Sequence, residues 1–287
     1  MKALFLKPLP ILLLVPAFLI AHITTKTFAQ NAADSIETKS ALKDHCPKVK
    51  PQTVKVISIS HDADLILEDG QQLTLANIFF PRTSPNAGLP KKTLQFLEDH
   101  LAHKTITYLA SAKTDRYQRT PAHIITNSGE SVQNWFQLLI IKSGIGLFMP
   151  QPLKASHNFY CDSDDLKQIL QYHDQQNMAQ KNRYQLTPVY HSNSKVLWQR
   201  KGNFAIVEGA VLKTHISKNT IFLNFGSDWK SDFTAVISAD NKPSLQKHFK
   251  SISNLEGKRL RLRGFLDLYN RPSMRIDHPL QIEMLHE

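Results

Sequence analysis

The pair Asp69-Gly70 separates two short apolar runs, Leu65 to Glu68 and Leu73 to Phe80. An Asp-Gly pair between strand-forming runs is a strong hairpin signal, because glycine accepts the positive φ angles of a tight turn. We therefore expect two antiparallel strands joined at this turn. Further strand-forming runs lie at Val54 to Ile59, Ile106 to Ala110 and Ala122 to Thr126. The first half of the chain is thus expected to be built on β-sheet.

Three helices are expected among these strands. Leu94, Leu97 and Leu101 recur at helical spacing, and a second apolar pattern runs from Ser131 to Ser143 and stops at Gly144. A third helix is expected from Ser163 to about Tyr184. Five strands with helices in this order match an oligonucleotide-binding (OB) barrel.

The second half of the chain repeats the strand-rich pattern. A polar segment that contains Ser and Asn, residues 187–199, is expected to link a first domain at 52–186 to a second at 200–287. The second domain is expected to be another small OB-like barrel, so the fold class is mainly β with helices. Its expected strands are 204–214, 220–225, 233–238, 259–268 and 281–285, with a short helix at 244–249.

The first residues have the three parts of a secretory signal. Lys2 and Lys7 precede an apolar run, and Thr27-Phe28-Ala29 supplies small residues suited to cleavage. The alternative is a membrane anchor, but Pro10 and Pro16 interrupt the run, and nothing later is long enough to span a bilayer. We expect a signal peptide at 1–29, a leader at 30–51, and an exported protein that is periplasmic or secreted.

The charge balance favours anionic partners. The chain carries 35 Lys and Arg against 24 Asp and Glu, a formal charge of +11. Loss of the signal removes three lysines and no acid, which leaves +8. Phosphate backbones, acidic polysaccharide and anionic lipid head groups all fit this charge, which does not choose among them; a basic surface without a specific partner also fits. The 13 His residues show no zinc-ligand spacing, and no glycine-rich phosphate loop or nucleophile elbow is present.

Two cysteines, Cys46 and Cys161, remain after the signal. An even number in an oxidising compartment predicts one disulfide, and two buried free thiols are the alternative. The bond would close a long loop and contribute about 4 kcal/mol by restricting the unfolded chain.

The segment Thr114-Asp115-Arg116-Tyr117-Gln118-Arg119 follows an Asp-x-Asp turn at Asp62 and Asp64. Together these motifs resemble the staphylococcal-nuclease (thermonuclease) family. By this resemblance Asp64 takes the place of a calcium aspartate, Arg119 that of a phosphate-clamping arginine, and Pro81 that of the proline in Asp-x-Pro-Glu. Three segments, 202–209, 223–233 and 278–283, resemble a C-terminal extension found on thermonuclease-like domains of some bacterial exported proteins.

The other functional positions of that family are substituted. Phe79 stands where the family has its second calcium aspartate, and Arg82 stands where it has the glutamate that acts as general base. Phe80 replaces a threonine, and Thr74 replaces an arginine. Calcium takes six to eight oxygen ligands, which phenylalanine side chains do not supply. The resemblance therefore implies a vestigial catalytic pair, Asp64 and Arg119, with at most a weak metal site at Asp64 and no resident cofactor.

Binding is the first expected role, with nucleic acid or another polyanion as ligand. Arg116 and Arg119 are candidate phosphate contacts, against the alternative of a surface pair bonded to Asp115; Tyr117 is expected to pack across the barrel. In the second domain, aromatic and basic residues are candidates for contact with the ligand by stacking and charge, foremost Trp229 and Lys230. The alternative is that the aromatic residues fill the barrel. The remaining candidates there are Phe225, Phe233, Arg261, Arg263, Tyr269 and Arg271.

Two rival functions remain open on the sequence. The first is a calcium-dependent phosphodiesterase whose site is rebuilt from Asp62, Asp64, Glu68 and Arg119, with calcium as its cofactor. The second is a cell-envelope scaffold that binds protein or glycan. A fold alone does not separate these, because function depends on the site.

Overall fold

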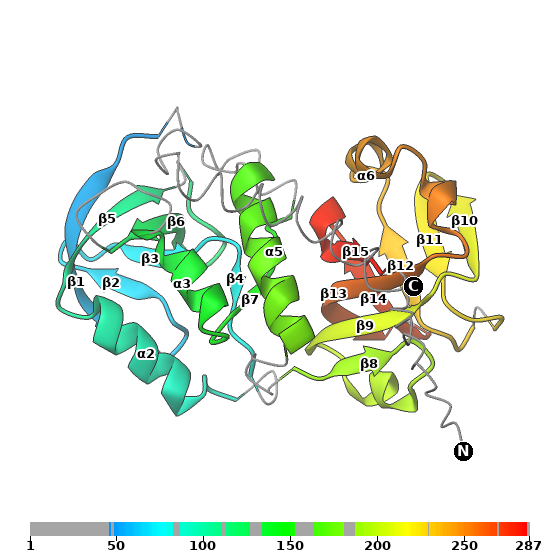
Figure 1. The fold of residues 1–287 in the computed structure, drawn as a ribbon, viewed down its shortest axis with the longest axis horizontal. Coiled ribbons are helices and arrows are strands. Elements are labelled where there is room, and N and C mark those ends of the chain that lie inside the picture. The colour runs from blue at the N-terminus through cyan, green and yellow to red at the C-terminus, as the bar shows by residue number, and fades with distance from the viewer. Residues whose placement is uncertain are drawn as a thin grey trace, which may run out of the picture.

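The computed structural model describes residues 46, 49–82, 87–110, 113–126, 134–152, 164–180, 187–228, 230–268 and 270–285. The expected signal peptide and nearly all of the expected leader lie outside these ranges. The described chain is mainly β, with four α-helices. Figure 1 shows two β bodies, one on each side of helix α5 (Asp164–Gln180).

The first body is a closed five-stranded barrel, as expected. The strand order is β1-β2-β3-β6-β5, and β1 closes the ring by pairing with β5. All pairs are antiparallel except β3 with β6. The strands are β1 (Gln52–Ile59), β2 (Leu65–Leu67), β3 (Gln72–Leu75), β5 (Thr105–Ala110) and β6 (Thr120–Ile125).

The expected hairpin is confirmed, but its second strand ends early. Leu65 pairs with Leu73 across the turn, where Gly70 has a φ of 83° and the Asp69 carboxylate accepts the Gln71 N–H at 3.0 Å. The prediction of one strand as far as Phe80 was wrong. The chain turns at Asn77, with a φ of 61°, and strand β4 (Ile78–Phe79) leaves the barrel to pair with β7 (Leu147–Phe148).

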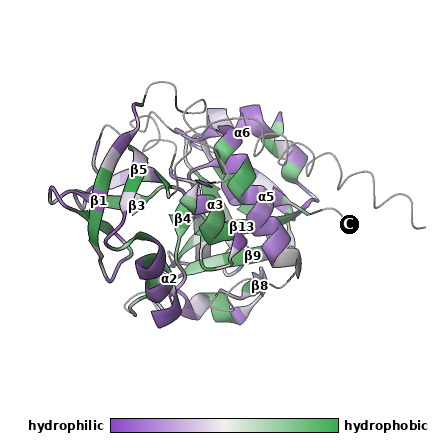
Figure 2. Cartoon of the chain, turned by 60° about the vertical axis from the view of Figure 1, so that its left-hand side comes forward, coloured by the Kyte–Doolittle hydropathy of each residue, from purple (hydrophilic) through white to green (hydrophobic). Residues whose placement is uncertain are grey.

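Two helices pack on the barrel close to their expected positions. Helix α2 (Lys91–Leu101) buries Leu97 and Leu101 in the barrel core. Helix α3 (Phe136–Lys142) is mostly hydrophobic in Figure 2, whereas α2 is largely hydrophilic on the side shown there. Buried Gln137 fixes α3 against β6, because its side chain donates to the Ala122 carbonyl at 2.7 Å and accepts the Ile124 N–H at 3.1 Å.

The second body is an eight-stranded sheet that curls around its own hydrophobic core. Its order is β10-β11-β12-β14-β13-β9-β8, with β15 on β13. In the described residues no pairing joins the end strands β10 and β8, so closure into a second barrel stays a prediction. The elements are β8 (Val189–His191), β9 (Phe204–Ala210), β10 (Lys213–Ser217), β11 (Thr220–Asn224), β12 (Thr234–Ile237), α6 (Lys242–Phe249), β13 (Arg259–Leu268), β14 (Pro272–Ile276) and β15 (Ile282–Met284).

Three details of this sheet differ from the sequence predictions. The expected strand 204–214 is two strands, β9 and β10, separated at 211–212. Strand β14 was not expected. Part of the expected linker is ordered structure, since β8 pairs with β9 and a 3-10 helix covers Lys195–Gln199.

A buried ion pair joins the two bodies. Arg263 of β13 pairs with Asp174 of helix α5, and both side chains are almost fully buried. Arg263 Nη1 also donates to the Phe148 carbonyl at 2.9 Å, on the barrel side. Leu280 from the second body packs into the core that α3 and α5 share. The two bodies are therefore held together by apolar packing and by a desolvated charge pair.

Candidate functional site

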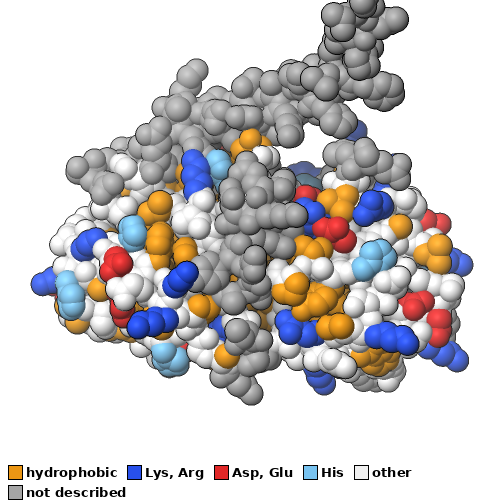
Figure 3. Space-filling model, turned by 60° about the horizontal axis from the view of Figure 1, so that its bottom comes forward, with side chains coloured by type: hydrophobic (Ala, Val, Ile, Leu, Met, Phe, Trp, Pro, Cys, Tyr) orange, Lys and Arg blue, Asp and Glu red, His pale blue; other side chains and the backbone are white. Residues whose placement is uncertain are grey.

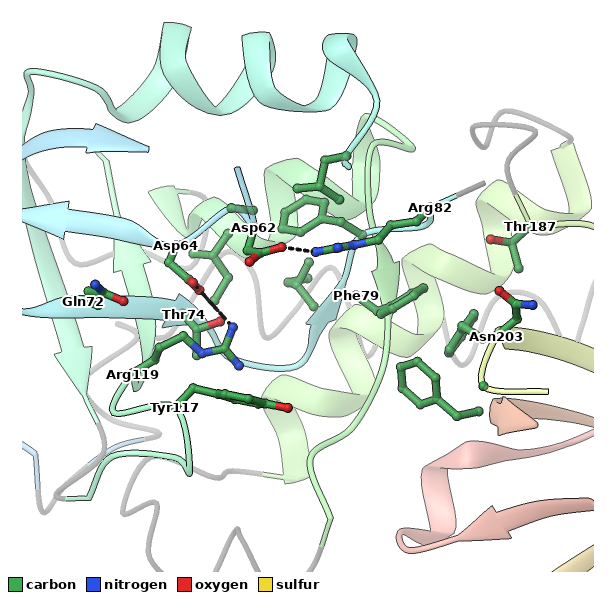
Figure 4. Close-up of a pocket in the computed structure, with 18 residues that line it drawn as sticks. Asp62, Asp64, Gln72, Thr74, Phe79, Arg82, Tyr117, Arg119, Thr187 and Asn203 are labelled. Atoms are coloured by element: carbon green, nitrogen blue, oxygen red, sulfur yellow. Dashed lines mark hydrogen bonds and ion pairs between the residues drawn. The ribbon is translucent and has the colours of Figure 1, made fainter. Parts of the chain in front are cut away.

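A cavity of about 690 Å³ lies between the barrel and the second sheet. Figure 4 shows the two carboxylates Asp62 and Asp64 on its barrel side and Asn203 and Thr187 on the opposite side. Its lining includes every position to which the resemblance to thermonucleases assigns a functional residue. These lining residues are Asp64, Thr74, Phe79, Phe80, Arg82 and Arg119.

Asp64 precedes β2 and is 5% exposed. Its backbone N–H donates to the Ser60 hydroxyl at 3.0 Å, and the preceding residue, Ala63, has a φ of 70°. Arg119 Nη1 lies 3.3 Å from Asp64 Oδ1 and 3.4 Å from Oδ2. Burial raises the pKa of the Asp64 carboxyl, while Arg119 and the Thr74 hydroxyl oppose that rise. The carboxylate therefore depends on Arg119 for its charge.

Arg119 is held by a second carboxylate as well. Its Nε and Nη2 donate to Asp115 Oδ2 at 2.9 and 2.7 Å. Asp115 Oδ1 accepts the backbone N–H groups of Tyr117 and Arg119 at 2.8 and 3.0 Å, which folds the turn back on itself. Of the two readings of this arginine from the sequence, the pairing with Asp115 is observed, and Asp64 is a further partner.

Arg82 neutralises the other acid of the turn. Its Nη2 lies 2.5 Å from Asp62 Oδ1, and its Nη1 donates to the Ala87 carbonyl at 3.3 Å. The hydrogen bond from Arg82 is the main cause of the lowered pKa of Asp62. Arg82 thus forms an ion pair with Asp62, and its guanidinium has no proton-accepting group to offer.

The two phenylalanines at the motif have different roles. Phe80 is buried in the barrel core. Phe79 crosses to the second body, where its ring stacks on Phe204 with centroids 4.2 Å apart and meets Phe265 edge-on at 5.5 Å. Phe79 therefore makes an apolar contact between the two bodies.

This donor set does not fit calcium. The ion needs several oxygen ligands, and both cavity carboxylates are already ion-paired with arginines. No cluster of three or more His, Cys, Asp or Glu side chains suited to a metal occurs in the described residues. Glu68, the further acid of the rebuilt-enzyme hypothesis, is exposed and accepts the Lys55 N–H at 3.3 Å without lining the cavity.

Tyr117 corrects one expectation from the sequence. It does not pack across the barrel; it is 59% exposed. The guanidinium carbons of Arg116 and Arg119 lie 4.7 and 5.0 Å from the centre of its ring. The ring lines both the main cavity and a second hollow of about 520 Å³ on the barrel. An exposed aromatic ring close to two guanidinium groups is a stacking surface beside positive charge.

The candidates in the second body separate into two groups. Phe233 is buried in its core, Arg261 pairs with Glu208 at 2.6 Å, and Arg263 pairs with Asp174, so these side chains stabilise the fold. Lys230 is exposed, and Arg271 lies 5.9 Å from the centre of the Phe222 ring. Trp229 and Tyr269 lie outside the described residues.

Cys46 is fully buried and disulfide-bonded. The only other cysteine of the sequence, Cys161, lies outside the described residues, so their pairing stays a prediction.

Sequence comparisons identify no relative. No protein-family model matches the chain, and no curated protein matches it. No helix among the described residues has the length and apolar character to cross a membrane.

Proposed function

We propose that the protein is an exported, thermonuclease-like binding protein that has lost metal-dependent hydrolysis and binds single-stranded nucleic acid. The likeness to thermonucleases rests on the Asp-x-Asp turn, the Thr-Asp-Arg-Tyr-Gln-Arg turn and the closed five-stranded barrel that carries them both. Export rests on the three-part N-terminal segment and on the disulfide at Cys46.

The loss of hydrolysis is supported by charge pairing in the cavity. Phosphodiester hydrolysis by this family depends on a metal, a carboxylate base and arginines that stabilise the transition state. Here Asp62 and Asp64 each pair with an arginine, and Arg82 stands in place of the base. The cavity lining carries two acids and two arginines, and so no excess charge to attract either a cation or a phosphate.

The observation that carries the binding proposal is the exposed Tyr117 ring, which lies close to the guanidinium groups of Arg116 and Arg119. A base stacks on an aromatic face whatever its sequence, and arginines beside the ring attract the phosphates. Arg119 is already paired with Asp64 and Asp115, so Arg116 is the arginine that meets the backbone. Figure 3 shows Lys and Arg side chains spread over both halves of one face, which suits weak contacts along a strand.

Equilibrium binding of fluorescent oligonucleotides to the signal-free protein tests the proposal. We expect calcium-independent binding that weakens steeply with salt and depends little on sequence. Tyr117→Ala is expected to lower affinity about tenfold, the cost of one lost stacked base. Arg116→Ala is expected to reduce the slope of log affinity against log salt by about one unit or less.

Matched controls separate stacking from nonspecific effects. Trp198→Ala removes another aromatic that is 42% exposed, and Arg259→Ala removes an exposed cation of the second sheet. Neither residue belongs to the Tyr117 turn, so both variants are expected to bind nearly as the parent does. If no oligonucleotide binds at low salt, or if Tyr117→Ala binds as tightly as the parent, the proposed binding role of the turn is wrong.

A further inference from the structure

The outer face of the second sheet carries a row of side chains that faces solvent. The strand register places His215 opposite Phe222, Phe222 opposite Val236, and Val236 opposite Arg275. The row therefore crosses β10, β11, β12 and β14 in turn. The neighbouring residues Ala235, Ile237, Met274 and Ile276 alternate to the inner face and are buried in the core. Strand alternation thus keeps the row on the face away from the core.

Phe222 is the centre of this row. The His215 ring stacks beside it with centroids 6.2 Å apart and planes 29° apart, and the Arg271 guanidinium carbon lies 5.9 Å from its centre. These residues line a hollow of about 690 Å³ that also includes Lys213. No Asp or Glu occurs among its described lining residues. The lining of this hollow thus combines flat rings with two cationic side chains, whereas the cavity at Asp64 is lined by equal numbers of acids and arginines.

This hollow continues towards the barrel. It shares Phe222 and Arg271 with a neighbouring hollow of about 390 Å³, which reaches Asp267 and Arg275. Asp267 and Arg275 in turn line a third hollow of about 750 Å³, which extends to Arg119 on the barrel. Adjoining hollows with shared walls therefore run from the Tyr117 turn to Lys213.

We infer that the Phe222 row is a second binding segment for single-stranded nucleic acid, and that one strand follows these hollows from the Tyr117 turn across the second sheet. The choice of ligand rests on the proposed function. Bases stack on the Phe222 and His215 rings, and phosphates meet Lys213 and Arg271. An acidic peptide would satisfy the cations but offers no regular series of flat rings, so the aromatic row favours nucleic acid.

Two linked contact segments make binding depend on ligand length. A strand that reaches only one segment gains only one set of contacts, whereas a longer strand binds the second segment intramolecularly. We therefore expect affinity to rise from oligothymidylates of about 8 nucleotides, which fit one small binding fold, to those of about 24. The rise should be larger than the increase in the number of binding registers explains.

The test uses the full signal-free chain with both oligonucleotides and a heparin fragment as an anion without bases. Phe222→Leu keeps an apolar side chain on the half-buried position and removes the ring; Lys213→Ala with Arg271→Ala removes the charges. Arg259→Ala is the control for loss of a positive charge elsewhere on the second sheet, since Arg259 lines none of the three hollows. Thermal unfolding of each variant establishes that it is folded.

Phe222→Leu is expected to lower affinity for the long oligonucleotide about tenfold and to leave heparin binding unchanged. The double charge variant should weaken the binding of both ligands, and Arg259→Ala should weaken the binding of neither.

Parent-like binding of the long strand by Phe222→Leu and by the double charge variant would overturn the inference. If Tyr117→Ala still weakened binding, the proposed function would stand without the inference. If Phe222→Leu weakened binding and Tyr117→Ala did not, the Phe222 row would bind without the Tyr117 turn, and both the proposed function and the path from that turn would be wrong. Loss with the charge variant but not with Phe222→Leu would identify a polyanion surface and overturn the inference.

Discussion

The ring of Phe79 stacks on that of Phe204, with centroids 4.2 Å apart, although the two residues belong to different β bodies. By the resemblance to thermonucleases, Phe79 stands where that family has a calcium aspartate. Phe79 supplies an aromatic contact between the barrel and the second sheet, next to Phe265.

Removal of the Phe79 ring should weaken the joint between the bodies. Phe79 is half-buried, so Phe79→Ala is expected to lower the free energy of unfolding by about 2 kcal/mol, less than for a fully buried phenylalanine. Phe79→Leu should lose less. Urea unfolding measures the change, with Trp198→Ala as the exposed aromatic control. Equal stability of Phe79→Ala and the parent would show that the contact does not hold the bodies together.

Arg119→Ala should destabilise the barrel through Asp64. The substitution leaves a buried carboxylate without its cation, which is expected to cost about 2 kcal/mol or more. Asp64→Asn in the Arg119→Ala background should recover part of that loss, because an amide needs no counter-charge. Arg116→Ala, which removes an exposed arginine from the same turn, is the control. Additive losses in the double variant would contradict this coupling.

The same pair predicts a pH dependence. Burial raises the pKa of Asp64 above 3.8, so the folded chain binds its proton more tightly than the unfolded chain. The stability from this group is therefore present below 3.8 and is lost as the pH rises through the folded pKa. Arg119→Ala should steepen that loss, and Asp64→Asn should abolish the difference between the two backgrounds. Unfolding free energies across the acid range measure both slopes.

His278 should act in the opposite direction. Burial, followed by the charges of Lys167 and His248, lowers its pKa to about 3. Its Nδ1 accepts the Leu280 N–H at 3.1 Å, and Lys167 Nζ lies 3.2 Å from its Nε2. The neutral ring is thus favoured in the folded state, and its stabilising contribution, full above 6.5, is lost as the pH falls from 6.5 towards 3. In His278→Asn the amide oxygen can still accept the Leu280 N–H, and the free energy of unfolding should depend less on pH over this range. An unchanged slope would contradict the role of His278.

Local signals predicted much of the fold from the sequence. The Asp69-Gly70 hairpin, helix α2 and strand β13 are found at or near their expected residues, because each depends on neighbours in the chain. The break after Leu75 was missed because Ile78, Phe79 and Phe80 continue the apolar pattern; only Asn77, which accepts a positive φ, marks the turn. Strand β8 was missed because its pairing with β9, not its own polar sequence, makes it a strand.

The candidate site was predictable in its residues but not in its pairings. The motif named Asp64, Arg82 and Arg119 as positions of one site, and all three line one cavity. The ion pair of Asp62 with Arg82 joins residues 20 positions apart, and the contact of Phe79 with Phe204 joins two bodies. Neither leaves a periodic signal in the sequence. The exposure of Tyr117 follows from the Asp115 turn, whose hydrogen bonds are visible only in the folded chain.

The disulfide at Cys46 should stabilise the barrel side of the molecule. Its closure of a long loop with Cys161 is expected to contribute about 4 kcal/mol. Cys46→Ala and Cys161→Ala should therefore lower the free energy of unfolding by similar amounts, and the double variant by no more than either single one. Peptide mapping without reductant, on exported protein, should recover the two cysteines in one linked fragment. Recovery of both as free thiols would contradict the pairing.

We propose that the protein binds nucleic acid without hydrolysing it, because arginines neutralise both carboxylates of the cavity. The most direct test incubates the signal-free protein with single- and double-stranded DNA and RNA, with calcium and with chelator. The account predicts no calcium-dependent cleavage, from the parent or from Phe79→Asp, since the latter still lacks a carboxylate base. Rapid cleavage by the parent that chelator abolishes, and that Asp64→Ala eliminates, would contradict it.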